Sequence, residues 1–365
     1  MKPLRILSPG LELRGEVDQY FSLSFIRRFH RPGEFQLVTS RKAANTQQLE
    51  LGLLIMLGAD PYKTGIIRHL EIETDEQGVE LIMVKGETLG GITRQRITFP
   101  LEQEAQDMIE GPGEAVLKHY VRRNCLDIPD MAFPMLAIAP NKHRGEPFKW
   151  QSRYKNLAEE LEKISLSTGL GWQIYLDFDL KKWVFDVVIG RDLTVHQDIH
   201  PPVIFSPEFE NIKTQSYIDS LMNYANKAIV AGQGEGVERE IAIVGTDATD
   251  LNLYVIFVDA RDVEHAVDLP NRGASKLAEH GRIQTFQSEV LTKGPFQYEK
   301  DWDLGDVVTV QNKAWSLTMN SRITEVAEIY EPGGFRLEVT FGNQLPTLSQ
   351  KLRTVLDEFK NESTK

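Results

Sequence analysis

Two stretches of equal length, one near each end of the chain, share a pattern of apolar residues and a glycine turn. Residues 66–86 (IIRHLEIETDEQGVELIMVKG) and residues 322–342 (RITEVAEIYEPGGFRLEVTFG) align without gaps, and Gly78 then coincides with Gly334. Each stretch follows a Leu-Gly pair and a short apolar segment. A repeated supersecondary unit predicts two similar β-units. The alternative is two unrelated hairpins that share turn chemistry.

Most of the chain has the pattern of β-structure. Between residues 17 and 38, Phe21, Leu23 and Phe25 alternate with serines, and Pro32-Gly33 marks a turn. Strict alternation of this kind is typical of half-buried strands joined in a hairpin. The same reading predicts further strands over 51–57, 65–73, 79–86, 228–231, 241–244, 253–258, 283–290, 306–311, 321–329 and 335–341.

The middle of the chain has a different pattern. Helices are predicted over 115–125 and 154–168, the second ended by Gly169, because apolar residues there recur at helical spacing. Two strands follow, over 172–178 and 183–189, and the Pro-rich segment 129–150 is interpreted as an ordered loop.

These elements predict an α+β fold that is mostly β. We expect a first β-domain over residues 1–100, completed by residues 203–231, and an α+β insertion domain over 101–202. A second β-domain is expected over 232–345, followed by a C-terminal amphipathic helix over 346–365. In that helix five apolar residues fall on one face and form a candidate interaction face: Leu348, Leu352, Val355, Leu356 and Phe359.

Charge and hydropathy exclude several classes of function. The chain has 41 basic and 53 acidic residues, a net charge of −12, and no cluster of Lys or Arg. Proteins that bind duplex DNA neutralise phosphates with clustered cations, so specific nucleic-acid binding is disfavoured. The longest apolar stretch, 51–59, is too short for a membrane span, and no secretion signal is visible.

Motifs that could carry chemistry are better explained as structure. Cys125 lies in an apolar helical run and is interpreted as a core residue. His196 and His200 precede two prolines, which exclude the helix that a shared metal would need. Residues 232–236 (GQGEG) lead into a strand, so a hairpin tip is favoured over a phosphate loop.

Two acidic motifs are also interpreted as structural. Asp177-Phe178-Asp179 lies between two predicted strands, where Asp commonly supports a turn. Residues 259–262 (DARD) are interpreted as a structural ion pair. We therefore predict no catalytic, cofactor-binding or metal site and no enzymatic activity.

A series of short segments resembles the siphophage tail-protein family related to baseplate hub and tail-associated tail-tip proteins. The segments run in the expected order over nearly the whole chain. They are 28–29 and 32–35; 65–67; 84–86 with Leu89 and Arg96; 154–157; Phe185 with 190–192; Phe205, Ser206 and Asn211; Asn226 with 230–232; 258–262; and 303–308.

The resemblance implies two tube-like antiparallel β-barrel domains with an α/β insertion and a C-terminal element. It also implies a homotrimer whose six β-domains form a ring that closes the tail tube and allows genome passage. The expected partners are other copies of the chain, distal tail or tail-tube proteins, the tape measure protein, and tail fibre or receptor-binding proteins. The expected location is the virion tail, assembled in the host bacterial cytoplasm.

A tail protein that binds or hydrolyses cell-wall glycans is the alternative function. Such a binder usually exposes aromatic side chains in a cleft, whereas the five tryptophans of this chain are scattered. Those within predicted strands are expected in the core.

Overall fold

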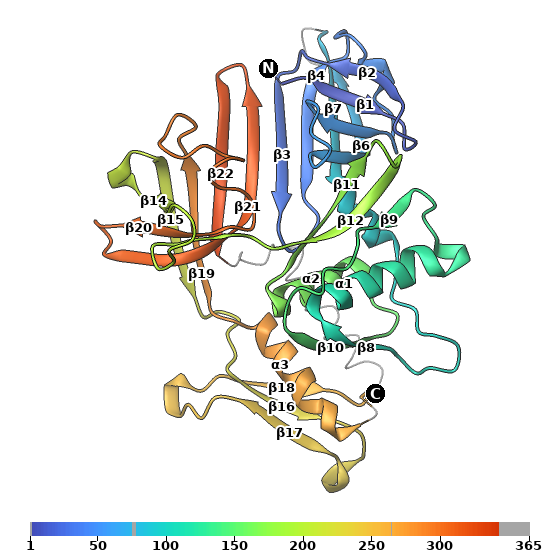
Figure 1. Cartoon of the computed structure of the whole chain (residues 1–365), viewed down its shortest axis with the longest axis vertical. Helices are drawn as coiled ribbons and strands as arrows, with labels where there is room; N and C mark the ends of the chain where they lie inside the picture. Colours follow the sequence, from blue (N-terminus) through green and yellow to red (C-terminus); the bar gives the residue numbers. More distant parts are fainter. Residues whose placement is uncertain (1, 75–77, 264, 343–365) are drawn as a thin grey trace.

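The computed structural model describes residues 2–74, 78–263 and 265–342, and these residues form a mostly β-structure with a few helices (Figure 1). The predicted C-terminal helix over 346–365, with its candidate interaction face, lies outside the described residues.

The first half of the main sheet is formed by the N-terminal part of the chain, in the order β3-β4-β7-β6-β5-β1-β2. All these neighbours pair antiparallel. The predicted hairpin over 17–38 is present as β3 and β4. The strands are β1 (Leu4–Leu7), β2 (Leu13–Val17), β3 (Ser22–Arg28), β4 (Glu34–Ser40), β5 (Leu54–Leu57), β6 (Thr64–Thr74) and β7 (Glu80–Thr88).

The second half has the order β15-β19-β22-β21, and β20 pairs with the first part of the long strand β21. The two halves are joined because β21 also pairs with β3. Among the described residues no strand pairing closes either half into a barrel. The strands are β13 (Asp192–Leu193), β14 (Ile204–Phe205), β15 (Ile212–Ser220), β19 (Ile283–Val290), β20 (Val307–Asn312), β21 (Leu317–Glu331) and β22 (Gly334–Gly342).

The sequence repeat is present in the structure as two equivalent hairpins, β6–β7 and β21–β22. Gly52 donates its N–H to the carbonyl of Ile67 at 2.9 Å, and Gly305 donates to the carbonyl of Ile323 at 2.8 Å. Both glycines have positive φ, 86° and 93°, a conformation that other residues adopt at a cost. The preceding strands, β5 and β20, pair with their hairpins in equivalent register.

Each hairpin also carries a β-bulge at the same place, after Ile67 in β6 and after Ile323 in β21. The ungapped alignment fails only beyond the turn. In the second strand of each hairpin the equivalent positions are offset by one residue, because Gly86 pairs with Ile67 whereas Phe341, not Gly342, pairs with Ile323. The prediction of two similar hairpin units is thus confirmed at the level of individual hydrogen bonds.

The insertion packs two helices against short sheets, and its core is shared with the first half through Leu54, Met56 and Ile66. Gly169 ends α2 with φ 68°, as predicted. The segment 129–150 is not only a loop, because it contains β9 and the start of β10. The elements are β8 (Asp107–Pro112), α1 (Gly113–Arg122), β9 (Leu136–Ile138), β10 (Pro147–Ser152), α2 (Leu157–Thr168), β11 (Gly171–Asp177) and β12 (Lys182–Val188).

A small separate unit follows β15 and lies at the bottom of Figure 1. Its three-stranded sheet has the order β17-β16-β18 and packs one face on α3, with its own core around Ala228, Val230 and Val258. Helix α3 was not predicted. The elements are β16 (Lys227–Ala231), β17 (Ile241–Gly245), β18 (Val255–Asp259) and α3 (Leu269–Glu279).

Residues 203–231 differ from the expectation that they complete the first β-domain. β14 pairs with β20, β15 pairs with β19, and β16 pairs with β17 and β18. The reason is that Phe205 and Ile212 share a core with Trp302 and Phe341 of the C-terminal part.

Candidate functional site: the joint and the open edges of the sheet

The joint between the two halves is a run of backbone pairing between β3 and β21. Pairing extends from Leu23 opposite Tyr330 to Arg28 opposite Glu325. At its end, Arg28 Nε binds the Glu325 carboxylate at 2.5 Å. The joint is therefore a continuous sheet rather than a contact between separate domains.

A buried cluster of charges lies beside this pairing. The side chain of Lys63, just before β6, is fully buried and forms ion pairs with Glu328 of β21 and with Glu299. Tyr330 donates its hydroxyl to Glu328 at 2.6 Å. Burial alone would raise the pKa of the Glu328 carboxyl, but Lys63 and the Tyr330 hydroxyl hold it below its ordinary value.

Arg27 of β3 forms the second connection of the cluster. It binds Asp303 at 2.5 Å and donates to the Tyr298 hydroxyl at 2.6 Å. The Tyr298 hydroxyl in turn donates to Glu328 at 3.0 Å. Burial strongly raises the pKa of Tyr298, which is therefore neutral. The cluster ties residues from both halves of the sheet together.

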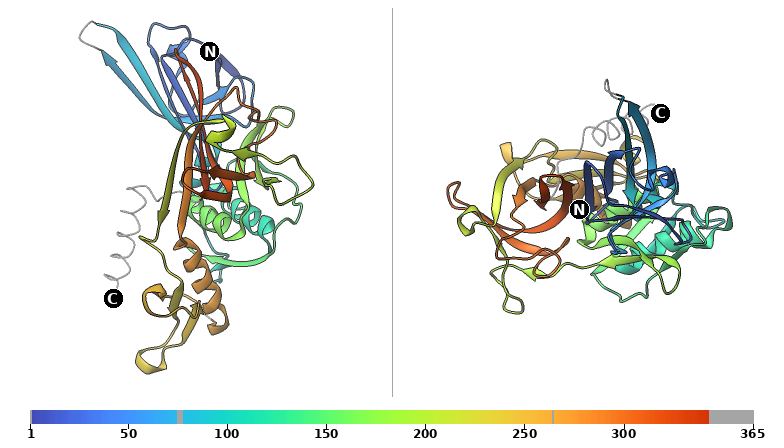
Figure 2. Two further views of the ribbon diagram at one scale, coloured as in Figure 1. Left: turned by 90° about the vertical axis from the view of Figure 1, so that its left-hand side faces the viewer. Right: turned by 90° about the horizontal axis from the view of Figure 1, so that it is seen from above.

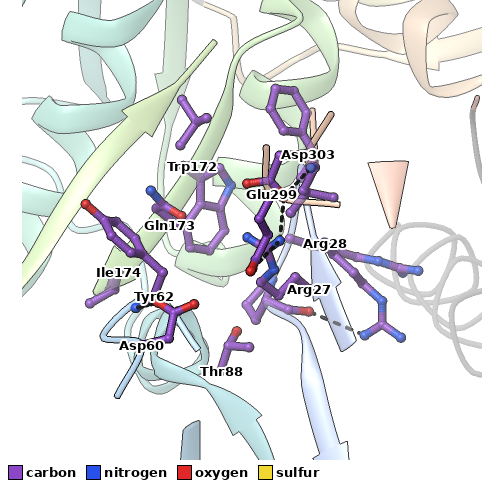
Figure 3. Close-up of a pocket in the computed structure, with 16 residues that line it drawn as sticks. Arg27, Arg28, Asp60, Tyr62, Thr88, Trp172, Gln173, Ile174, Glu299 and Asp303 are labelled. Atoms are coloured by element: carbon purple, nitrogen blue, oxygen red, sulfur yellow. Dashed lines mark hydrogen bonds and ion pairs between the residues drawn. The ribbon is translucent and has the colours of Figure 1, made fainter. Parts of the chain in front are cut away.

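A cavity of about 350 Å³ opens next to the cluster, between the joint and the insertion (Figure 3). Arg27, Glu299 and Asp303 point toward one another on one wall, and Trp172 and Tyr62 line the wall opposite. The charged groups of the wall are engaged with each other. The ion pairs and hydrogen bonds of this wall hold residues of the two halves of the sheet together.

The edge of β6 beyond the bulge is open. Residues 69–74 of β6 pair with β7 on one side. On the other side, β5 pairs only with residues 64–66, and no described strand pairs with residues 69–74. His69, Ile72 and Glu73 are exposed, Ile72 to 45%. Figure 2 shows the β6–β7 hairpin extending away from the body of the molecule.

The outer edge of β15 is open as well. β15 pairs with β19 on one side and ends the sheet path on the other. Lys213, Thr214, Ser216 and Asp219 are exposed along it. Exposed edges present unpaired backbone donors and acceptors and are templates for another strand.

The structure places the motifs that we interpreted as structural. Cys125 is buried, and burial raises the pKa of its thiol to about 12, as expected of an unreactive core residue. Residues 232–236 connect β16 to β17. Asp177 accepts the backbone N–H of Leu180 at 2.8 Å in the turn between β11 and β12.

The remaining motifs lie apart from one another. His196 and His200 lie in the loop between β13 and β14, and Arg261 pairs with Asp259 at 2.6 Å as predicted. Of the tryptophans in predicted strands, Trp172 and Trp183 are buried, as expected. No group of three or more potential metal ligands is found in the described parts of the chain.

No described helix is long and apolar enough to cross a membrane. The joint itself was missed by the sequence analysis. Nothing in the sequence around Lys63 distinguishes it from a solvated lysine, because its partners Glu299 and Glu328 are more than 200 positions away.

The fold is shared with phage tail proteins of known structure. A 43 kDa tail protein of prophage MuSo2 from Shewanella oneidensis superposes with a TM-score of 0.60 at 13% identity, covering 93% of this chain and 98% of that chain. A tail protein from Neisseria meningitidis gives a TM-score of 0.56 at 14% identity, with 94% and 97% covered.

A third similar structure is the prophage tail protein gp18 from Listeria monocytogenes, with a TM-score of 0.54, 11% identity, and 99% and 100% of the chains covered. A comparison with curated protein sequences finds no match. The model of the family described as Siphovirus ReqiPepy6 Gp37-like protein matches residues 3–343. The chain therefore belongs to this siphovirus tail-protein family and is a protein of the virion tail.

Proposed function

We propose that this protein is a structural tail-tip component, a baseplate hub, in which three copies form a ring of six similar β-units. One observation carries the proposal: the joint between β21 and β3 is an internal example of how one unit binds the next. The β6 edge, which is equivalent to the covered part of β21, is open.

The repeat identifies the strand that would cover that edge. The order β3-β4-β7-β6-β5 in the first unit corresponds to β15-β19-β22-β21-β20 in the second. The ring pair Phe25 and Phe35 of β3 and β4 corresponds to Tyr217 and Phe286 of β15 and β19. β15 is therefore the equivalent of β3, and its outer edge is also open.

Transferring the β21–β3 register to these strands gives a specific contact between protomers. The exposed Ile72 of one copy is placed opposite Tyr217 of the next. The expected pairs are Leu70–Asp219, Glu71–Ile218, Ile72–Tyr217, Glu73–Ser216 and Thr74–Gln215, by equivalence with the register from Val326–Arg27 to Tyr330–Leu23.

In the resulting ring, β21–β3 joints within each chain alternate with β6–β15 joints between neighbouring chains. The β6 edge of each chain would pair with the β15 edge of the next chain. Such a head-to-tail contact is heterologous, and it generates a closed ring when the rotation between neighbouring chains fits a whole number of copies. The number of three chains in the ring comes from the family resemblance. A ring would pair the open edges of β6 and β15, and so would remove the aggregation hazard that these two exposed edges pose.

In this role the ring closes the tail tube, docks distal tail, tail-tube and tape measure proteins and tail fibres, and lets the genome pass. The net charge of −12 supports passage without retention, because the chain carries no cluster of cations for phosphates. The domains expected over 1–100, 101–202 and 232–345, with tube-like barrels completed across protomers, are part of this proposal, except that residues 203–220 belong to the second half of the sheet.

Engineered disulfides test the ring. Glu73→Cys with Ser216→Cys places two thiols at directly paired positions, where Cβ spacing suits a disulfide. Because Cys125 is buried with a raised pKa, it does not compete. We expect covalent dimers and trimers after oxidation. Glu73→Cys with Lys213→Cys, three positions out of register, is the control, and equal cross-linking of both pairs would contradict the register.

The glycan-binding or peptidoglycan-hydrolysing alternative has less support. Trp302 is fully buried, and Trp172 and Trp183 are in the core, so these rings offer no platform for a sugar. The family and the similar structures are tail proteins. Clearing of purified cell walls by the isolated chain, lost on mutating one carboxylate, would favour the alternative.

A further inference from the structure

The small unit that contains α3 exposes an apolar sheet face. One face of the β17-β16-β18 sheet packs on α3 through Val230, Val244 and Val258. The opposite face carries five large apolar residues, all at least one-third exposed: Ile229, 36%; Ile241, 53%; Ile243, 66%; Val255, 48%; and Phe257, 64%. We call these five residues the apolar face.

The strand register makes this face contiguous. Ile243 of β17, Ile229 of β16 and Phe257 of β18 are direct neighbours across the three strands. In this mixed sheet β17 is antiparallel and β18 parallel to β16. A sheet that is covered on one side only normally has a polar outer face. A sheet that is apolar on both faces is covered on both, because a contiguous exposed patch is a site of binding or aggregation.

The described chain ends at the base of this unit. Gly342, the last residue of β22, pairs with Thr285 in β19. Three residues separate the end of α3 at Glu279 from the start of β19 at Ile283. Ile283 pairs with Ser220, where β15 leads into the unit. Residues 343–365 therefore start where the unit joins the main sheet.

The sequence of that segment complements the apolar face. Leu348, Leu352, Val355, Leu356 and Phe359 have helical spacing, and Pro346 precedes them. Twelve helical residues span about 18 Å, and a five-residue strand spans about 17 Å, so one helix of this length covers one sheet of this size. A link of five extended residues reaches about 17 Å.

We propose that the apolar face is the docking site of the C-terminal segment of the same chain, which would cover the small sheet on the side opposite to α3. The stripe from Leu348 to Phe359 would then contact Ile229, Ile243 and Phe257. This proposal does not depend on the ring, because the segment and the face belong to one chain.

Limited proteolysis of the full-length chain tests the docking. Trypsin can cleave after Lys351 and Arg353, within the segment. The double variant Ile243→Asp and Phe257→Asp is expected to raise the rate of this cleavage by about tenfold, since removing a docked partner increases local opening. The segment variant Leu352→Asp with Leu356→Asp is expected to have the same effect, and combining the two pairs should add little.

The matched control changes two equally apolar residues of the same unit outside the face. Val237 and Leu251 are 103% and 92% exposed and lie in short 3-10 helices between the strands. Val237→Asp with Leu251→Asp is expected to leave the cleavage rate unchanged. An unchanged far-ultraviolet circular dichroism spectrum in all variants shows that the fold is intact. Equal cleavage of the wild type and the face variant would overturn the proposal.

A disulfide separates docking within a chain from exchange between chains. Ile243→Cys with Leu352→Cys, oxidised in dilute solution, is expected to give a cross-linked monomer. Cross-linked multimers alone would mean that a second copy supplies the segment, and would overturn docking within one chain. Val267→Cys, an exposed position in the same unit outside the face, replaces Ile243→Cys in the control pair.

Discussion

The two copies of the repeated hairpin have equivalent backbone pairing but differ in the strand that lies on their outer edge. The strand β21 is paired with β3 over residues 325–330 in addition to β22, whereas the equivalent residues 69–74 of β6 are paired with β7 alone among the described strands. Val326, Ala327 and Glu328 are buried, but His69 and Ile72 are exposed. The difference lies in the neighbouring strand, since the pairing within each hairpin is equivalent.

The comparison is most instructive at one pair of positions. Glu328, a carboxylate, is 2% exposed, and its equivalent Ile72, an apolar residue, is 45% exposed. The Glu328 carboxylate can be buried because Lys63 forms an ion pair with it and the hydroxyls of Tyr298 and Tyr330 donate hydrogen bonds to it. An apolar residue exposed at the equivalent position is consistent with a partner on that edge.

Removing the buried lysine should have the largest effect on the covered joint. Lys63→Ala leaves Glu328 buried without its cation, and breaking a buried pair in this way costs about 3–5 kcal/mol. Denaturant unfolding measures the loss. Lys85→Ala on β7, where the side chain is exposed, is the control and should change the unfolding free energy by less than about 0.5 kcal/mol. Equal effects would show that the cluster does not hold the joint.

The equivalent glycines should respond differently to alanine. A left-handed backbone costs a non-glycine residue about 1–2 kcal/mol of stability. Gly52→Ala should cost no more than this, because a Cβ at position 52 would have no atom within 4 Å. At Gly305 a Cβ would lie 2.4 Å from the Phe29 ring, so overpacking adds about 1–3 kcal/mol. Thermal or denaturant unfolding of both variants checks this order. A more damaging Gly52→Ala would contradict it.

Acid should weaken the covered joint through Glu328. The folded-state pKa of this carboxyl is lowered, so its charge contributes stability above the ordinary pKa, near 4.3, and this is lost as pH falls through the folded value. Glu328→Gln lacks the charge at every pH. Its deficit, about 1–3 kcal/mol at pH 7, should shrink below about pH 4. A deficit independent of pH would mean that the charge is not the source.

Local patterns in the sequence predicted the hairpins, their turn glycines and the helix ended by Gly169, because each depends on neighbouring residues. They did not predict α3, in which Pro270 and Gly273 obscure the helical spacing. Pro270 lies in the first turn, where its missing N–H has no cost, and Gly273 lets the helix approach Val230 and Val244 closely.

Long-range partners could not be predicted from one sequence. The pairing of residues 203–220 with the second half depends on a core that collects Phe205, Trp302 and Phe341 from distant segments. The buried state of Lys63 likewise depends on groups brought together only by the joint. The repeat was the exception, because equivalent segments can be recognised without knowing what they contact.

A substitution on the open edge of β6 is expected to have the smallest effect on stability and the clearest effect on assembly. Ile72→Lys replaces an exposed side chain, so the isolated chain should change in unfolding free energy by less than about 0.5 kcal/mol. In a ring the same lysine would face Tyr217 of the next protomer, and lysine on a strand edge opposes further pairing. We therefore expect a stable chain that no longer assembles, measured as mass in solution. Met108→Lys, with 48% exposure elsewhere on the surface, is the matched control and should assemble normally. If Ile72→Lys forms the same assembly as the wild type, β6 is not the edge that joins protomers, and the two hairpins differ for a reason other than assembly.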